Sequence, residues 1–252
     1  MSVTQVGSFK ESRVYALMFA ATLFMMSWAI IQPVYALYVQ SMGANLVQLG
    51  LLLSLKSFLP LVLRIPLSIV GERIGRVRLM LVDMLIAVTA AVLYSLASSF
   101  IHLILIVLLE SLASASFNQT AMSTVSDLSP PGRQGNTMGR YLTFLAIGML
   151  GGPAFCAVLI SFLSYSQLFL LSASFPLLGL VLLSLRSPHV PRLNLDEDGG
   201  PEVGAMDSLR MIFRNRNVML LSFCRLSFSV TQALFLALFS VYLDDMGIRS
   251  QV

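Results

Sequence analysis

The feature that most constrains this sequence is a series of apolar runs, each roughly 20 residues long, separated by short polar links. A helix of about 20 residues spans the roughly 30 Å hydrocarbon core of a bilayer. Of the 252 residues, 57% are hydrophobic and 11% are charged, whereas a soluble domain carries about 25% charged residues. The sequence therefore predicts an all-α, polytopic protein embedded in the lipid bilayer.

The apolar runs give seven candidate spans. We divide the chain into a cytoplasmic tail at 1–13, a six-helix transmembrane bundle at 14–186, a cytoplasmic central loop at 187–216 and a seventh helix within 217–252. The seventh span resembles the first, because Tyr38 and Tyr242 are each followed, after three residues, by Met-Gly. The predicted spans are 14–39, 46–69, 79–98, 101–125, 138–162, 166–186 and 217–243.

Basic residues occur in alternate links. The links at 40–45, 99–100 and 163–165 contain no Lys, Arg, Asp or Glu, whereas the N-terminal tail and the intervening links are basic. The positive-inside rule then places the N-terminus in the cytoplasm, and we expect a multi-pass protein of the plasma membrane. A seven-helix receptor, an alternative that the span count suggests, would have the opposite orientation.

The link between the second and third spans reads SIVGERIGRVR. A tight turn between adjacent helices needs a residue without Cβ crowding, which a glycine provides. The link resembles the signature loop of the major facilitator superfamily of secondary transporters, in which Gly, three residues, an acid, a base, any residue and Gly precede further bases. The matching residues are Ser68 (for Gly), Glu72 (for Asp), Arg73, Gly75, Arg76 and Arg78.

The fifth span resembles a motif of the antiporter branches of the same superfamily. Its matching residues are Gly139, Gly148, Gly152 and Pro153, but the final two glycines of the motif are replaced by Cys and Ala. Gly148 and Gly152 form a small-xxx-small face for close helix contact, and Pro153 removes one backbone hydrogen bond. The resemblance implies proton-coupled efflux by antiport.

A segment at the end of the fourth span reads VSDLSPPGR and resembles the corresponding link of superfamily members. We expect Asp127 in this segment to pair with Arg76 at the cytoplasmic face. Such a bridge would hold one access state and break in the other.

Four charged residues fall inside the first four predicted spans, at Lys56, Arg64, Asp83 and Glu110. A charge at the bilayer centre costs about 2.5–3.5 kcal/mol on insertion scales, so it generally faces a cavity or a partner. Arg64 and Asp83 lie near the cytoplasmic ends, and we expect both side chains to reach toward the headgroups. Lys56 and Glu110 lie deeper and are candidates for function.

Glu110 begins a stripe along the fourth span. Glu110, Ser114 and Asn118 recur every four residues and therefore share one helix face. A desolvated carboxyl group favours its neutral form, so Glu110 is a candidate proton carrier. A structural pair with Lys56 is the alternative, and the sequence leaves both open.

The first and seventh helices line the central cavity in this superfamily, so their polar residues are candidates for a substrate pocket. In the first span Trp28, Gln32 and Tyr35 share a face. In the seventh span the corresponding residues are Arg225, Ser229 and Gln232.

These resemblances imply a secondary transporter that moves a small solute by alternating access. The sequence contains no phosphate-binding loop, metal-ligand spacing or nucleophile–base arrangement, so we expect no enzyme activity, no cofactor, no metal and no nucleic-acid partner. Superfamily members usually have twelve helices, and we therefore expect this chain to be a fragment; self-association of two chains is the alternative. A non-transporting membrane scaffold is a further alternative.

Overall fold

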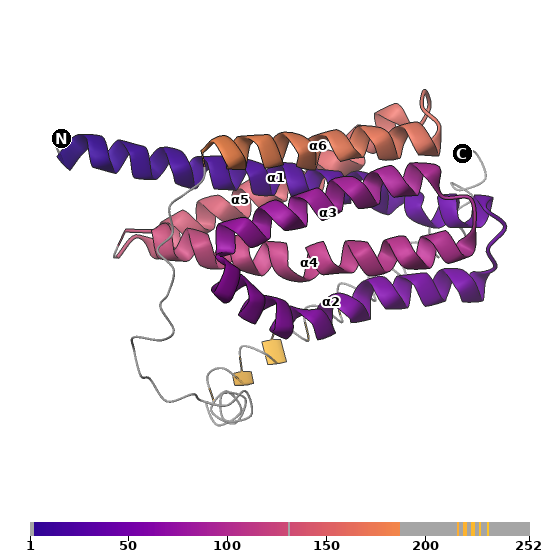
Figure 1. Ribbon diagram of the computed structural model, residues 1–252, viewed down its shortest axis with the longest axis horizontal. Helices are drawn as coiled ribbons and strands as arrows, with labels where there is room; N and C mark the ends of the chain where they lie inside the picture. Colours follow the sequence, from indigo (N-terminus) through magenta and orange to yellow (C-terminus); the bar gives the residue numbers. More distant parts are fainter. Residues whose placement is uncertain are drawn as a thin grey trace. The chain divides into compact units, whose positions relative to one another are not determined.

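The computed structural model of the chain describes residues 3–130, residues 132–186 and a few isolated positions between 216 and 231, with side chains described from Ser12 onward. The described residues up to Arg186 belong to one compact unit, Met1–Leu193, in which six helices lie side by side (Figure 1). Each is long and apolar enough to cross a membrane. The helices are α1 (Val3–Ser41), α2 (Leu46–Ile74), α3 (Arg76–Leu96), α4 (Phe100–Leu128), α5 (Gln134–Leu159) and α6 (Tyr165–Leu185).

Each of the six predicted spans of the bundle corresponds to one helix, but α3 and α5 end at Leu96 and Leu159, before the predicted ends at 98 and 162, and the helices extend beyond several other predicted ends. Helix α1 starts at Val3 and not at residue 14, α2 continues to Ile74 and α4 continues to Leu128. Hydropathy locates the apolar stretch, whereas a helix continues through charged residues until a turn ends it. The central loop 187–216 and most of the seventh span 217–243 lie outside the described residues.

Short turns join the helices at the end of the bundle that carries no charged connection, which we call the uncharged end (42–45, 97–99 and 160–164). At the start of α2, Asn45 Oδ1 accepts from the Gln48 N–H at 2.8 Å, and Gln48 Oε1 accepts from the Asn45 N–H at 2.9 Å. This reciprocal capping box satisfies backbone donors that the first turn leaves free. The short polar turns therefore begin new helices immediately.

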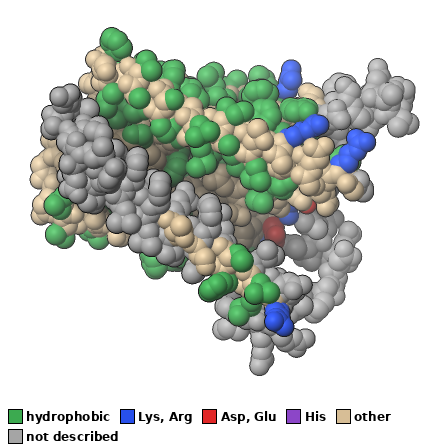
Figure 2. Space-filling view, turned by 180° about the vertical axis from the view of Figure 1, so that it is seen from behind, with side chains coloured by type: hydrophobic (Ala, Val, Ile, Leu, Met, Phe, Trp, Pro, Cys, Tyr) green, Lys and Arg blue, Asp and Glu red, His purple; other side chains and the backbone are tan. Residues whose placement is uncertain are grey.

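Arginines gather at the opposite end, which we call the basic end. Figure 2 shows one face of the molecule, on which hydrophobic side chains cover the middle of the helices and the Lys and Arg side chains of the helices lie toward one end. Large exposed apolar residues such as Phe58, Leu150 and Phe162 suit a lipid-facing surface. The basic end contains Arg73, Arg76, Arg78, Arg133, Arg140 and Arg186.

Helix α1 is the most buried of the six, and it packs along α5 and α6, while α4 packs against α2 and α3. A cluster of buried aromatic residues near the uncharged end joins α1, α3 and α6. In it the Tyr38 hydroxyl donates to the Tyr94 carbonyl oxygen, and the Tyr38 ring lies edge-on to the Phe169 ring, with centroids 4.6 Å apart. These contacts fix the position of α3, which carries a polar side chain of the site described below.

Two glycines allow α5 to approach α1 closely. A Cβ atom on Gly148 would lie 2.5 Å from the Thr22 carbonyl oxygen, and one on Gly152 would lie 2.5 Å from Ala29 Cβ. The predicted small-xxx-small face is therefore confirmed for this pair. Gly139 is exposed, with no atom within 4 Å of a built Cβ, so it takes no part in this contact. The helix continues through Pro153 to Leu159.

Asp83 corrects the expectation that its side chain reaches toward the headgroups. The residue is only 2% exposed, and its carboxylate accepts a hydrogen bond from Ser116 Oγ at 2.7 Å. The reason is that α3 packs against both α4 and α6 and turns Asp83 toward the interior. Arg64, by contrast, is exposed on α2.

Substitution of Gly152 by Ala should destabilise the bundle by about 1–3 kcal/mol, because the added methyl group meets the backbone of α1 and has no space to move. Gly139→Ala is the matched control, and it should be neutral or slightly stabilising because alanine favours helix by up to about 1 kcal/mol over glycine. Thermal unfolding of the detergent-solubilised chain measures both changes. Equal midpoints for the two variants would contradict the close α1–α5 contact.

Candidate functional site

The turn between α2 and α3 consists of a single residue, Gly75. Its φ of +99° lies in a region that side-chain-bearing residues rarely adopt, and its N–H donates to the Gly71 carbonyl at 3.0 Å. Gly71 is buried, and a Cβ atom there would lie 2.8 Å from Leu79 Cδ2. The predicted tight turn is confirmed, and Gly71 is a residue that the motif comparison missed, although it directly precedes the acid of the motif.

Arg76 and Asp127 form the ion pair that the sequence predicts, with Arg76 Nη1 on Asp127 Oδ2. The pair joins the first residue of α3 to the last turn of α4 at the basic end. The Arg76 side chain is 17% exposed and the Asp127 side chain 48%. A pair this exposed contributes about 0–1 kcal/mol, so it is weak enough to break when the helices move.

The other residues of the signature loop lie on the surface. Glu72, Arg73 and Arg78 are exposed, and none of them forms an ion pair within the part of the chain that the structure describes. Ser68 is also exposed, and its hydroxyl donates to the Ile65 carbonyl of its own helix at 2.8 Å. Among the described side chains, Arg76 is the one loop arginine that contacts an acid.

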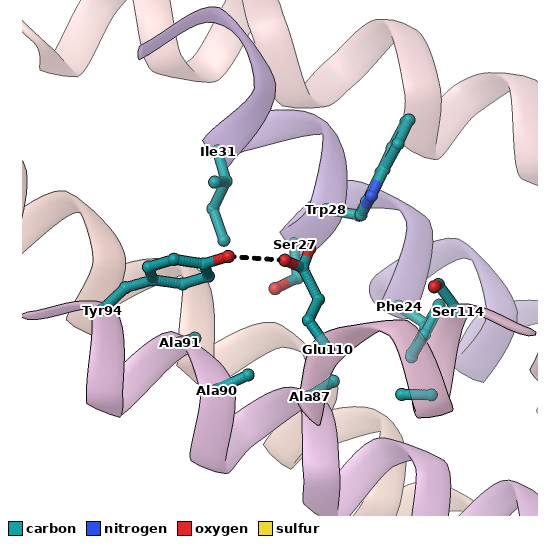
Figure 3. Close-up of a pocket in the computed structure, with 11 residues that line it drawn as sticks. Phe24, Ser27, Trp28, Ile31, Ala87, Ala90, Ala91, Tyr94, Glu110 and Ser114 are labelled. Atoms are coloured by element: carbon teal, nitrogen blue, oxygen red, sulfur yellow. Dashed lines mark hydrogen bonds between the residues drawn. The ribbon is translucent and has the colours of Figure 1, made fainter. Parts of the chain in front are cut away.

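A second ion pair lies inside the bundle. Lys56 Nζ on α2 lies 3.0 Å from Glu110 Oε2 on α4, and the two side chains are 12% and 13% exposed. The Tyr94 hydroxyl on α3 donates to the same carboxylate oxygen at 2.7 Å (Figure 3). The Lys56 ammonium also lies 4.1 Å from the centre of the Tyr35 ring. Residues from four helices thus surround one positive and one negative charge.

This ion pair borders a hollow of about 280 Å³. The hollow lies among α1, α2 and α4 and combines an indole, an amide, two opposite charges and three hydroxyl groups. A smaller cavity of about 30 Å³ lies on the other side of Glu110, among α1, α3 and α4 (Figure 3). The lining residues of the larger hollow are Trp28, Gln32, Leu53, Lys56, Ser57, Glu110, Ser111 and Ser114.

The structure brings some of the predicted pathway residues together and separates others. Gln32, Lys56 and Glu110 line the hollow, whereas Tyr35 is buried behind Lys56 with its ring edge-on to Tyr94. Asn118 lies two turns further along α4 and does not line the hollow. The remaining two candidates, Arg225 and Gln232, are outside the described residues.

Tyr94 is the residue of this charged site that sequence analysis did not identify. It is fully buried, and its hydroxyl supplies the one hydrogen bond to Glu110 from α3. A tyrosine within an apolar run resembles any aromatic packing residue. Only the spacing of Tyr94 from Glu110, across the short turn between α3 and α4, could have suggested that the two meet.

Comparisons with known proteins agree with this architecture. The model of the Major Facilitator Superfamily matches residues 17–252. An uncharacterized MFS-type transporter from Methanocaldococcus jannaschii is 21% identical over 143 residues, which cover 57% of this chain and 37% of that protein.

A solved structure has the same fold. It is the inward-facing, unoccupied form of a bacterial homologue of the human lysosomal transporter Spinster, with a TM-score of 0.63 and 20% identity. The match covers 81% of this chain and 49% of the solved chain. The chain therefore spans less than half the length of the relatives that it matches.

The six apolar helices and the charged pair within them are typical of a multi-pass membrane protein. The chain belongs to the Major Facilitator Superfamily. The family assignment removes the seven-helix receptor from the alternatives that the sequence suggested, and it agrees with the expectation that the chain is not an enzyme.

The Lys56–Glu110 pair allows a test by double substitution. Glu110→Gln alone leaves the Lys56 ammonium without its counter-charge inside the bundle. Breaking a fully buried pair in this way costs about 3–5 kcal/mol of folding free energy. That figure is an upper limit here, because the hollow admits some solvent. Adding Lys56→Gln should recover much of that loss, since the double variant buries no charge. Thermal unfolding of the two single variants and the double variant gives the coupling, and strictly additive losses would argue against a direct interaction.

Proposed function

We propose that the chain is part of a secondary active transporter that moves a small solute across the membrane by alternating access. The residues that line the hollow beside Lys56 and Glu110 would form one side of the solute path. The observation that carries the proposal is this ion pair, which borders a 280 Å³ space inside a largely apolar bundle. Charged residues within a membrane protein are unfavourable unless they are paired or face a polar cavity. The superfamily membership supports the same reading.

The Arg76–Asp127 pair is the proposed clasp between access states. It connects α3 and α4, the two helices that carry Tyr94 and Glu110. A shift of α3 relative to α4 would therefore break the clasp and change the surroundings of the carboxylate together. The single-residue turn at Gly75 transmits the movement of α3 directly to α2, where Lys56 lies.

We place the basic end on the cytoplasmic side of the plasma membrane. Seven arginines, from Arg13 to Arg186, lie at or near the helix ends on this side, whereas the three connections of the uncharged end contain no charged residue. This asymmetry is what the positive-inside rule describes.

Proton coupling is a further part of the proposal, with Glu110 as the proton site. The carboxylate has two described partners, Lys56 and Tyr94, and it borders a space that a solute can enter. Efflux and antiport rest on the resemblance of the fifth helix alone. Gly148 and Gly152 of that motif hold α5 against α1, but its last two positions are Cys156 and Ala157.

Removal of the clasp should shift the balance of access states. We suggest Ser57→Cys as a reporter in the hollow, in a chain whose natural Cys156 and Cys224 are replaced. Arg76→Ala or Asp127→Ala should change the ratio of maleimide labelling from the two membrane faces by up to about fivefold, the equivalent of about 1 kcal/mol.

Arg78→Ala is the matched control, because Arg78 is exposed on the same loop and has no acidic partner among the described side chains. The exchanged pair Arg76→Asp with Asp127→Arg should restore the original ratio. Labelling of Ser57→Cys from one face only, unchanged in every variant, would contradict alternating access.

A further inference from the structure

We propose that the hollow beside Lys56 and Glu110 binds a small organic anion together with one proton. The inference rests on the proposed transport function and adds the chemical class of the solute. In the described structure Lys56 pairs with Glu110. In the loaded site Glu110 has accepted a proton and the anion takes its place beside Lys56. Proton and anion therefore favour each other's binding.

The surroundings of Lys56 stabilise its positive charge independently of Glu110. Its ammonium lies 4.1 Å from the centre of the Tyr35 ring and 5.7 Å from the centre of the Tyr94 ring. The negative faces of aromatic rings attract a cation, and the attraction strengthens where water is excluded. When Glu110 is neutralised, the Lys56 ammonium lacks a counter-charge, and the solute can supply one.

Glu110 can accept a proton without losing its other partner. Within the described part of the chain, the titratable groups that face it are Tyr35 on α1, Lys56 on α2 and Tyr94 on α3. Helix α5 places no titratable side chain within hydrogen-bond distance of Glu110 in the described part of the chain. A neutral carboxyl group can still accept the Tyr94 hydrogen bond. Protonation therefore breaks the ion pair with Lys56 selectively.

Charge balance favours an anion over a cation. The site carries one positive and one negative charge when Lys56 pairs with Glu110, and it again carries one of each when it holds a monoanion and a proton. A cationic solute on Glu110 would lie close to the Lys56 ammonium, which is 3.0 Å from the carboxylate. The cationic solute and the Lys56 ammonium would then be two like charges a few ångströms apart, and such charges repel strongly in a medium less polar than water.

The lining of the hollow offers an organic anion one amide donor and an apolar surface. The hydroxyls of Ser57 and Ser111 already donate to carbonyls of their own helices, at 3.0 Å and 2.6 Å, so they are not available as donors to a solute. The Gln32 amide is exposed to the hollow and forms no hydrogen bond with the described residues, so its N–H groups can serve a solute. Trp28 adds an apolar surface for the rest of the molecule. Transport of such a pair moves proton and anion in the same direction, which is symport and not the antiport that the fifth-helix resemblance implies.

Trp28 provides the readout, because it is the single tryptophan of the chain and it lines the hollow. The probes are cyclohexanecarboxylate, its neutral amide and cyclohexylamine, which share one ring and differ in charge. Titration of Trp28 fluorescence in the full chain should show carboxylate binding that weakens as the pH rises from about 6 to 8, by up to about tenfold per pH unit, since one proton is taken up per anion.

Two variants separate the roles of the pair. Glu110→Gln should bind the carboxylate with an affinity that does not change with pH, because its neutral amide imitates the protonated acid. Lys56→Gln should lose at least tenfold in carboxylate affinity at the lower pH. Three results would each overturn the proposal. The neutral amide could bind as tightly as the carboxylate, cyclohexylamine could bind more tightly than the carboxylate, or the carboxylate could fail to bind at any pH.

The labelling of Ser57→Cys distinguishes this inference from the transport function. Access from both membrane faces without carboxylate binding would leave alternating access in place and refute only the anion class. Carboxylate binding with access from one face would support the site and refute the transport cycle.

Discussion

The arrangement of this bundle depends on one constraint, which is that a charge inside a membrane protein needs a counter-charge or a polar cavity. Lys56 and Glu110 meet this constraint together, at 3.0 Å from each other, on helices that are not neighbours in the chain. Their pairing holds α2 against α4, and the Tyr94 hydroxyl brings α3 to the same carboxylate. A group that takes the place of either charge would replace the direct contact between α2 and α4, and this is how the proposed solute would act on the helices.

The described contacts divide the bundle into a part built for close packing and a part built to change. Gly148 and Gly152 bring α5 so near to α1 that a single added carbon collides with its backbone, so these two helices move as one. The contacts among α2, α3 and α4 include two ion pairs, one inside and one at the basic end. Ion pairs can be exchanged for other partners at small net cost, whereas a packed glycine face has one arrangement. We infer that movement concentrates between α3 and α4.

Local features of the sequence predicted the six spans, the turn at Gly75 and the pair between Arg76 and Asp127. Each depends on a short stretch of chain or on a motif with known spacing. The inward side of a helix was harder to predict, as Asp83 shows, because lipid is as apolar as the protein interior and composition alone does not distinguish the two faces. Tyr94 lies in an apolar run, so it resembled a packing residue. The sequence also left open whether Glu110 forms a structural pair with Lys56 or acts as a proton site.

The most direct test of the account is infrared difference spectroscopy of the membrane-embedded chain as cyclohexanecarboxylate is added. Protonation of one buried carboxylate replaces its ionised absorption band with that of a neutral carboxyl group. We predict this change in the natural chain and in Asp83→Asn, and its loss in Glu110→Gln. An unchanged carboxylate signal on anion binding, or a signal lost with Asp83 and retained without Glu110, would contradict the exchange of partners at Lys56.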